Sequence, residues 1–148
     1  MKIAVAADHG GFDLKEIIKR HLENRGVEIL DLGTYSHESV HYPVFGARCA
    51  HAVADGECDF GIVVCTTGIG ISITANKIPG IRCALCSDVL SAELTRRHNN
   101  ANMLALGGAI VGPGLALRIV DAFLSASFEG GRHQIRVDMI RDAEEGRL

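Results

Sequence analysis

The chain has 148 residues, of which 47% are hydrophobic and 22% charged, and its net charge is −3. This length is typical of one well-cored domain, so residues 1–148 are expected to form a single domain. The charge argues against a general nucleic-acid binder, which presents a basic surface, and no apolar run approaches the roughly 20 residues of a membrane span. The apolar start, Met1–Ala7, is too short for a signal peptide and lacks a cleavage signal, so we expect a cytoplasmic protein.

Short apolar runs alternate with amphipathic stretches along the whole chain. Strands are predicted at Lys2–Ala7, Val27–Leu32, Gly61–Cys65, Arg82–Cys86 and Met103–Leu106. Helices are predicted at Phe12–Asn24, Tyr42–Ala54, Ile69–Lys77, Asp88–His98, Leu115–Ser127 and Arg132–Glu145. The strands are almost continuously apolar, which is typical of strands covered on both faces. Because strand–helix–strand repeats give parallel strands with right-handed crossovers, the pattern predicts an α/β fold, a three-layer α/β/α sandwich with a five-stranded parallel sheet.

The loop Cys65–Gly70 joins a predicted strand to a predicted helix and contains a thiol, two hydroxyls and two glycines. Backbone N–H groups at the start of a helix can hold an oxyanion, and the helix dipole favours the thiolate form of a cysteine there. A buried, inert cysteine in a tight turn is the alternative. Because ligands of such folds bind at the carboxyl ends of strands, the loop is a candidate reaction site.

Other titratable groups also gather at the junctions between elements. Asp8 and His9 follow the first strand, and His98 closes the fourth helix. His98 suits a general acid or base because histidine titrates near neutral pH; the alternative is a histidine that pairs with free carbonyls at a helix end. For Asp8 the alternative is a helix N-cap.

Arg132 and Arg136 lie four residues apart at the start of the last predicted helix, so their side chains project from one face. Two guanidiniums beside a helix N-terminus suit a phosphate or carboxylate ligand. A solvated charged face is the commoner fate of arginines. The preceding glycines, Gly130 and Gly131, favour the phosphate interpretation.

Neither a nucleotide cofactor nor a metal ion is expected. The stretch Gly68–Ile73 contains G-x-G but has Ile73 where a dinucleotide-binding motif needs a third small residue, and the chain has no P-loop. Asp8, His9, His98 and His133 could in principle bind a metal, but no local ligand motif supports one.

The five cysteines do not suggest a disulfide framework, because their number is odd and the chain has a core of its own. Cys83 and Cys86 have the C-x-x-C spacing of redox and zinc sites. Residues three apart on a strand point to opposite faces, so a structural role is favoured for this pair over a thiol redox function.

Taken together, these segments resemble the ribose-5-phosphate isomerase B family, which also includes the galactose-6-phosphate isomerase subunits. The resemblance runs almost end to end through Asp8–Gly11, Asp31–Thr34, Tyr42–Pro43, Cys65–Ser72, Ala75–Lys77, His98–Asn102 and Glu129–Val137. It implies a Rossmann-like sandwich and a homodimer or dimer of dimers with active sites shared between two subunits. It also implies metal-free interconversion of an aldose phosphate and a ketose phosphate, with ribose 5-phosphate as the first choice of substrate.

The same resemblance implies a role for each residue at the reacting end. Cys65 would be the base that moves a proton between C1 and C2. Thr67 and the N–H groups of Gly68 to Gly70 would stabilise the enediolate oxygen. His98 would open the furanose ring, with Asp8 assisting.

The rest of the sugar phosphate would be held by a second group of side chains. Arg132 and Arg136 would bind the phosphate, with His9 close by, and Asn99 would contact the sugar hydroxyls. The substrate-binding residues expected in all are Asp8, His9, Thr66, Thr67, Gly68, Ile69, Gly70, Asn99, Arg132 and Arg136.

Two residues depart from the family's pattern. Family loops often read Cys-Gly-Thr-Gly, whereas this chain has Thr66 in the glycine place, and Ala109 stands where a basic residue is common. These departures leave a hexose 6-phosphate, such as galactose or allose 6-phosphate, open as an alternative substrate. A sugar-phosphate-binding module without turnover is a weaker alternative, because binding alone does not require a base such as Cys65.

Overall fold

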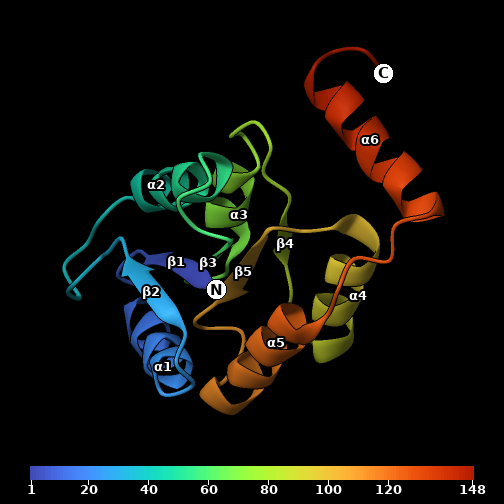
Figure 1. The fold of residues 1–148 in the computed structure, drawn as a ribbon. Coiled ribbons are helices and arrows are strands. Elements are labelled where there is room, and N and C mark those ends of the chain that lie inside the picture. Colours follow the sequence, from blue (N-terminus) through green and yellow to red (C-terminus); the bar gives the residue numbers. More distant parts are fainter.

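A five-stranded parallel sheet lies at the centre of the chain, which a computed structural model describes from residue 1 to residue 148 (Figure 1). The strands are β1 (Lys2–Ala7), β2 (Glu28–Asp31), β3 (Phe60–Cys65), β4 (Cys83–Leu85) and β5 (Met103–Gly107). The helices are α1 (Phe12–Glu23), α2 (Tyr42–Ala54), α3 (Ile69–Ala75), α4 (Val89–Asn99), α5 (Pro113–Ser125) and α6 (Arg132–Glu144). The predicted sandwich is confirmed, and none of the helices combines the length and apolar composition that crossing a bilayer requires.

The strand order β2-β1-β3-β5-β4 places β3 in the middle, paired in parallel with β1 on one side and β5 on the other. Helices α1, α4 and α5 cover one face of the sheet, and α2 and α3 cover the other. The carboxyl ends of β1 and β3 are therefore neighbours, and the Asp8 N–H donates to the Val64 carbonyl across them at 3.2 Å. This pairing brings the loop after β1, which carries Asp8 and His9, next to the loop Cys65–Gly70 after β3.

The two faces of the sheet carry separate hydrophobic clusters, and the cysteine pair is divided between them. Cys86 belongs to the cluster under α1, α4 and α5, whereas Cys83 packs against the cluster under α2 and α3. The expectation that Cys83 and Cys86 point to opposite faces is confirmed. Burial raises the pKa of both thiols, to about 12 for Cys83 and about 11 for Cys86, so neither is a reactive thiolate at neutral pH.

Local sequence signals account for most helix boundaries. Asp88 caps α4, as its position before the helix predicts, with its carboxylate accepting the Ser91 N–H at 2.7 Å. Helix α5 begins at Pro113, two residues earlier than predicted. A proline is well tolerated in the first turn because its missing N–H has no helical partner there.

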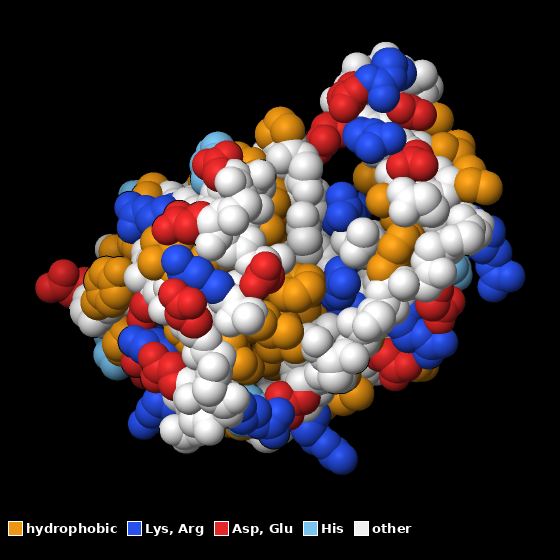
Figure 2. All heavy atoms as spheres, in the orientation of Figure 1, with side chains coloured by type: hydrophobic (Ala, Val, Ile, Leu, Met, Phe, Trp, Pro, Cys, Tyr) orange, Lys and Arg blue, Asp and Glu red, His pale blue; other side chains and the backbone are white.

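Helix α6 lies at one side of the molecule and packs mainly against α4 (Figure 1). Only His133 and Val137 are buried along it, whereas Ile135, Met139 and Ile140 are exposed. Its far end is fixed by Glu144, whose carboxylate oxygens accept the Gly80 N–H at 3.1 Å. A hollow of about 490 Å³ separates α6 from the loop that leads into β4 (Figure 2).

A buried lysine ties α1 to the loop after β2. The Lys15 ammonium is almost fully buried and donates to an Asp31 carboxylate oxygen at 2.7 Å and to the Thr34 carbonyl at 2.8 Å. Burial alone would raise the pKa of Asp31, but the hydrogen bonds from Lys15, Lys19 and the Gly33 N–H, together with the Lys15 charge, lower it, and the net pKa is lowered.

We expect Asp31→Asn to lower the free energy of unfolding by about 3 kcal/mol, because it leaves the buried Lys15 charge without its closest partner. Urea unfolding at neutral pH measures this loss. The Asp31 contribution is complete above its ordinary pKa of 3.8 and disappears as pH falls through the lower folded-state pKa. The difference between the two proteins should therefore shrink in acid; a constant difference down to that range would contradict the pairing.

Candidate active site

A cleft of about 470 Å³ opens at the carboxyl ends of β1 and β3. Five of the residues predicted for the reacting end line it together, namely Asp8, Cys65, Thr67, Ile69 and Gly70. Thr66, predicted to bind substrate, also lines the cleft, and the remaining lining residues are Tyr42 and Ile73. Sequence reasoning gave no role to Ile73 and noted Tyr42 only as part of the family resemblance, because nothing in the local pattern shows that these side chains face the same cleft.

Side chains of the glycine loop accept hydrogen bonds from its backbone. The Gly68 N–H donates to Cys65 Sγ at 3.1 Å, and the Ile69 N–H donates to Thr67 Oγ1 at 3.3 Å. A hydrogen bond to sulfur stabilises the thiolate more than the thiol. An enediolate oxygen would have to compete for these two N–H groups, whereas neither bond uses the N–H of Gly70.

Gly68 is required by the shape of this loop. Its φ of +78° lies in the left-handed region, and a Cβ there would come within 2.8 Å of the Leu106 backbone carbon on the neighbouring strand β5. A side chain at this position is excluded by both conformation and space. The loop therefore holds Cys65 and Thr67 in one defined arrangement.

The loop after β1 presents Asp8 and His9 from a fixed backbone. Asp8 is buried, and its Oδ1 accepts the N–H groups of Gly10 and Gly11 at 2.9 and 3.1 Å. Asp8 is not the helix cap, since the N-cap of α1 is Gly11. His9 Nδ1 lies 3.1 Å from the Val40 N–H and accepts its hydrogen bond, which leaves Nε2 to carry the proton and to donate outward.

Thr66, which occupies the glycine place of the family loop, packs against the β1 loop. A Cβ added at Gly10 would meet Thr66 Oγ1 at 2.1 Å, so the Thr66 side chain fills the space beside Gly10. Its carbonyl accepts the Ala109 N–H at 2.9 Å. The two departures from the family's pattern, Thr66 and Ala109, are thus direct neighbours at this edge of the sheet.

His98 and Asn99 lie at the amino ends of the strands, whereas Cys65 lies at their carboxyl ends. Helix α4 starts at the carboxyl ends of the strands and runs back, so that its last residues directly precede β5 (Figure 1). Strand β5 has five residues and spans about 16 Å at 3.3 Å per residue. Within one chain, His98 and Asn99 therefore do not reach the Cys65 cleft, because a crossover helix ends where the next strand begins.

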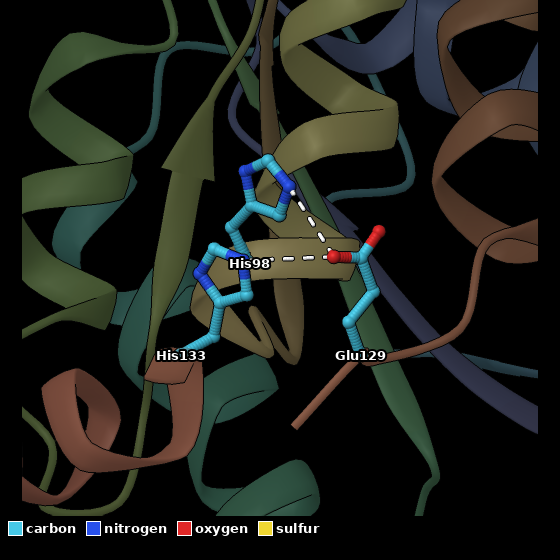
Figure 3. Close-up of side chains that lie close together, drawn as sticks. All are labelled: His98, Glu129 and His133. Carbon is cyan, nitrogen blue, oxygen red and sulfur yellow. Dashed lines mark ion pairs between the residues drawn. The ribbon is translucent and has the colours of Figure 1, made fainter. Parts of the chain in front are cut away.

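Around His98 the structure assembles a cluster that sequence reasoning missed (Figure 3). The His98 and His133 rings are stacked, with centroids 4.2 Å apart and planes within 6°. Glu129 Oε2 lies 3.7 Å from His98 Nε2 and 3.5 Å from His133 Nε2. The i,i+4 spacing of Glu129 and His133 signals that pair, but no sequence pattern brings α4 to them.

The side chains of Glu129 and His133 differ in charge at neutral pH. A hydrogen bond from Arg97 lowers the pKa of Glu129, so it is a carboxylate at neutral pH. Burial lowers the pKa of His133, and the neighbouring His98 adds to the effect. Glu129 is therefore the anion of the cluster, and His133 is a neutral ring at neutral pH.

His98, Glu129 and His133 are also the side chains best placed to hold a metal ion, with one donor atom of each within 4.8 Å of the others. A zinc ion bound at about 2.0–2.1 Å would need donor atoms about 3.4 Å apart. Arg97 already binds the other Glu129 oxygen at 2.6 Å, and its positive charge disfavours a cation. The two Glu129–histidine distances come close to this spacing, so it is the positive charge of Arg97, and not the spacing, that counts against a cation.

The two arginines predicted to bind phosphate occupy the first turns of α6, beside the His98 cluster. Arg136 lines an apolar cavity of about 330 Å³ with Met139, Ile140, Ala143 and Leu148. No cavity of the chain is lined by both Cys65 and either arginine. The predicted residues thus form two groups. The first lies around Cys65 at the carboxyl ends of the strands, and the second lies around His98 and the start of α6 at their amino ends.

Comparisons with known proteins agree with this fold. Residues 3–140 match the model of the ribose/galactose isomerase family. The chain is 53% identical to ribose-5-phosphate isomerase B of Escherichia coli over 99% of its own length and 98% of that protein. It superposes on Clostridium thermocellum ribose-5-phosphate isomerase B with a TM-score of 0.98 at 53% identity, covering both chains completely.

A third relative has been solved with a sugar phosphate. This is ribose-5-phosphate isomerase B of Mycoplasma genitalium with bound ribulose-5-phosphate, at 41% identity and a TM-score of 0.92, over 97% of this chain and 96% of that one. Similarity of this extent in both sequence and fold assigns the family. The chain belongs to the ribose/galactose isomerase family.

Proposed function

We propose that this chain, acting as one catalytic domain over residues 1–148, interconverts ribose 5-phosphate and ribulose 5-phosphate. Relatives of similar sequence and fold carry the name ribose-5-phosphate isomerase B, and one of them holds ribulose-5-phosphate. The observation that carries the proposal is the thiol of Cys65, which accepts a backbone N–H inside a cleft shared with Asp8 and Thr67. The mechanism needs a free thiol, which fits a reducing compartment such as the cytoplasm.

Cys65 is the proposed base. As a thiolate it takes the proton from C2 of the open aldose, which places negative charge on O1 in an enediolate, and it returns that proton to C1. The proton of the O2 hydroxyl moves to O1, so that C2 becomes the carbonyl carbon of the ketose. Thr67 Oγ1 and the N–H groups of Gly68, Ile69 and Gly70 are the donors proposed to stabilise this oxygen, and Thr66 lines the same cleft. Such preorganised donors count most where negative charge develops in the transition state.

The phosphate end of the substrate is assigned to the residues around His98 and the start of α6. Arg132 and Arg136 hold the phosphate, joined by His9 Nε2, and Asn99 contacts the hydroxyls. His98 opens the furanose ring with help from Asp8. Binding energy from the phosphate then orients the reacting carbons against Cys65.

The two groups can meet only if the site is shared between two copies of the chain. The two groups lie at opposite ends of the strands, and no cavity joins them. A two-fold axis that places the α4–α6 end of one copy over the Cys65 cleft of the other completes both sites at once. The exposed apolar residues Ile135, Met139 and Ile140 on α6 give this homodimer, or a dimer of dimers, surface to bury.

A hexose 6-phosphate is the second candidate substrate, since the family includes galactose isomerases. Thr66 Oγ1 lies against Gly10, so it narrows the cleft toward the β1 loop and favours the smaller pentose. Incubating the protein with ribose, galactose or allose phosphates and following aldose–ketose exchange by NMR tests the choice. We expect turnover of ribose 5-phosphate; faster turnover of a hexose 6-phosphate would support the alternative, and binding without turnover would contradict both.

A further inference from the structure

The His98 ring has neighbours on its face and at its edge. One face stacks on His133 at a centroid distance of 4.2 Å, and its Nε2 edge faces Glu129 Oε2 at 3.7 Å (Figure 3). His133 is 6% exposed, so it forms a fixed surface behind the His98 ring. These two contacts leave Nδ1 as the nitrogen of His98 that is not directed at Glu129.

Glu129 is itself held in place by α4. Its backbone N–H donates to the Arg97 carbonyl at 3.0 Å, and its Oε1 accepts from Arg97 Nε at 2.6 Å and lies 2.5 Å from Arg97 Nη2. Arg97 also binds Glu93 at 2.8 Å on the same helix. The carboxylate is therefore fixed to the helical turn that carries His98, with its second oxygen aimed at the imidazoles.

Apart from Glu129, the charged side chains that act on the His133 ring are basic, namely His98, Arg132 and Arg136. Arg97 comes from α4, and Arg132 and Arg136 come from α6. Glu93 binds Arg97 rather than either ring. Glu129 is thus the carboxylate that both histidine nitrogens face, and a substitution there changes the orientation of the rings without removing a phosphate-binding side chain.

We propose that Glu129 is a positioning residue for His98 in ring opening, with the buried His133 ring as its support. The inference rests on the proposed function. In this step the C1–O4 bond breaks, the C1=O1 carbonyl forms, the O1 hydroxyl loses its proton and O4 gains one. His98 exchanges a proton with the sugar through Nδ1, while Glu129 holds Nε2 and takes no part in any bond that is made or broken.

Two reactions of the same protein separate ring opening from enolisation. Isomerisation of ribose 5-phosphate passes through the ring. Exchange of the C1 hydrogen of ribulose 5-phosphate in D₂O does not, because this ketose has no free 5-hydroxyl to close a furanose and needs only the base. We expect Glu129→Gln to slow isomerisation by about 10- to 100-fold, the size of effect that misplacing a catalytic group by about 1 Å can have, with KM little changed and C1 exchange kept within about two-fold of the wild-type rate.

Matched variants decide the interpretation. Glu93→Gln removes the other carboxylate on Arg97 and should leave both reactions unchanged. His98→Gln should show the Glu129→Gln pattern more strongly, and the double variant should add little to it, because one residue acts through the other. Equal losses of isomerisation and exchange in Glu129→Gln, or no loss of either, would overturn the proposal. Wild-type protein that catalyses neither reaction would instead refute the proposed function.

Discussion

Cys65→Ala is expected to reduce isomerase turnover by about 10²- to 10⁴-fold, the range that a general base contributes. The substitution removes the base and the hydrogen bond from the Gly68 N–H to its sulfur, but it keeps the backbone of the loop, because the φ of +78° belongs to Gly68 and the strand pairing of Cys65 with Gly107 uses only backbone. Affinity for a sugar phosphate should change little, since the phosphate is assigned to the arginines. Steady-state kinetics and calorimetric binding of ribose 5-phosphate measure the two quantities on one preparation.

Cys86→Ala is the matched control for this prediction. Cys86 is also a buried thiol beside the site, in a neighbouring cavity that shares Thr67 and Ile69 with the cleft. Burial raises its pKa to about 11, so it stays protonated at neutral pH and should be dispensable for turnover. Wild-type rates in Cys65→Ala, or an equal loss in both variants, would remove Cys65 from the mechanism.

Arg136→Ala is expected to raise KM for the sugar phosphate by about 10- to 100-fold, since a charged hydrogen bond to phosphate contributes about 1.5–3 kcal/mol. Arg132→Ala should act in the same direction, and the double variant should lose more than either. The effect on kcat at saturating substrate should be smaller than the effect on KM. Initial rates over a wide range of ribose 5-phosphate concentration separate the two parameters.

Arg141 provides the control on the same helix. It is exposed and pairs with Asp138 at 3.2 Å, and it lies more than a turn beyond Arg136. Arg141→Ala should leave KM unchanged. If Arg136→Ala behaves like Arg141→Ala, the phosphate is not bound at the start of α6.

The sequence predicts the elements of this fold well because each signal is local. Continuous apolar runs give β1, β3 and β5 within a residue or two, and the cap residue Asp88 gives the start of α4. The position of Pro113 in the first turn of α5 was missed, because the apolar stripe of that helix becomes regular only later. Errors of this size do not alter the topology.

The arrangement of the site could be predicted only in part. Asp8 and Cys65 meet because both follow strands of a parallel sheet, and this is readable from the order of elements. His98 looks equivalent in the sequence, but it lies in the last turn of a crossover helix, so the chain has already returned to the amino ends of the strands. Two contacts join segments far apart in the chain, namely the stacking of His98 on His133 and the contact of Thr66 with Gly10. No rule of residue spacing predicts such contacts.

Subunit complementation tests most directly whether two copies share each site. Cys65→Ala protein and protein carrying both Arg132→Ala and Arg136→Ala are mixed under conditions of subunit exchange, at low ribose 5-phosphate. If Cys65 and the arginines meet across the interface, each mixed dimer has one intact site, and activity should rise to about a quarter of the wild-type value. A mixture that exchanges subunits and stays inactive would contradict the proposal that Cys65 of one copy and the arginines of the other form one site.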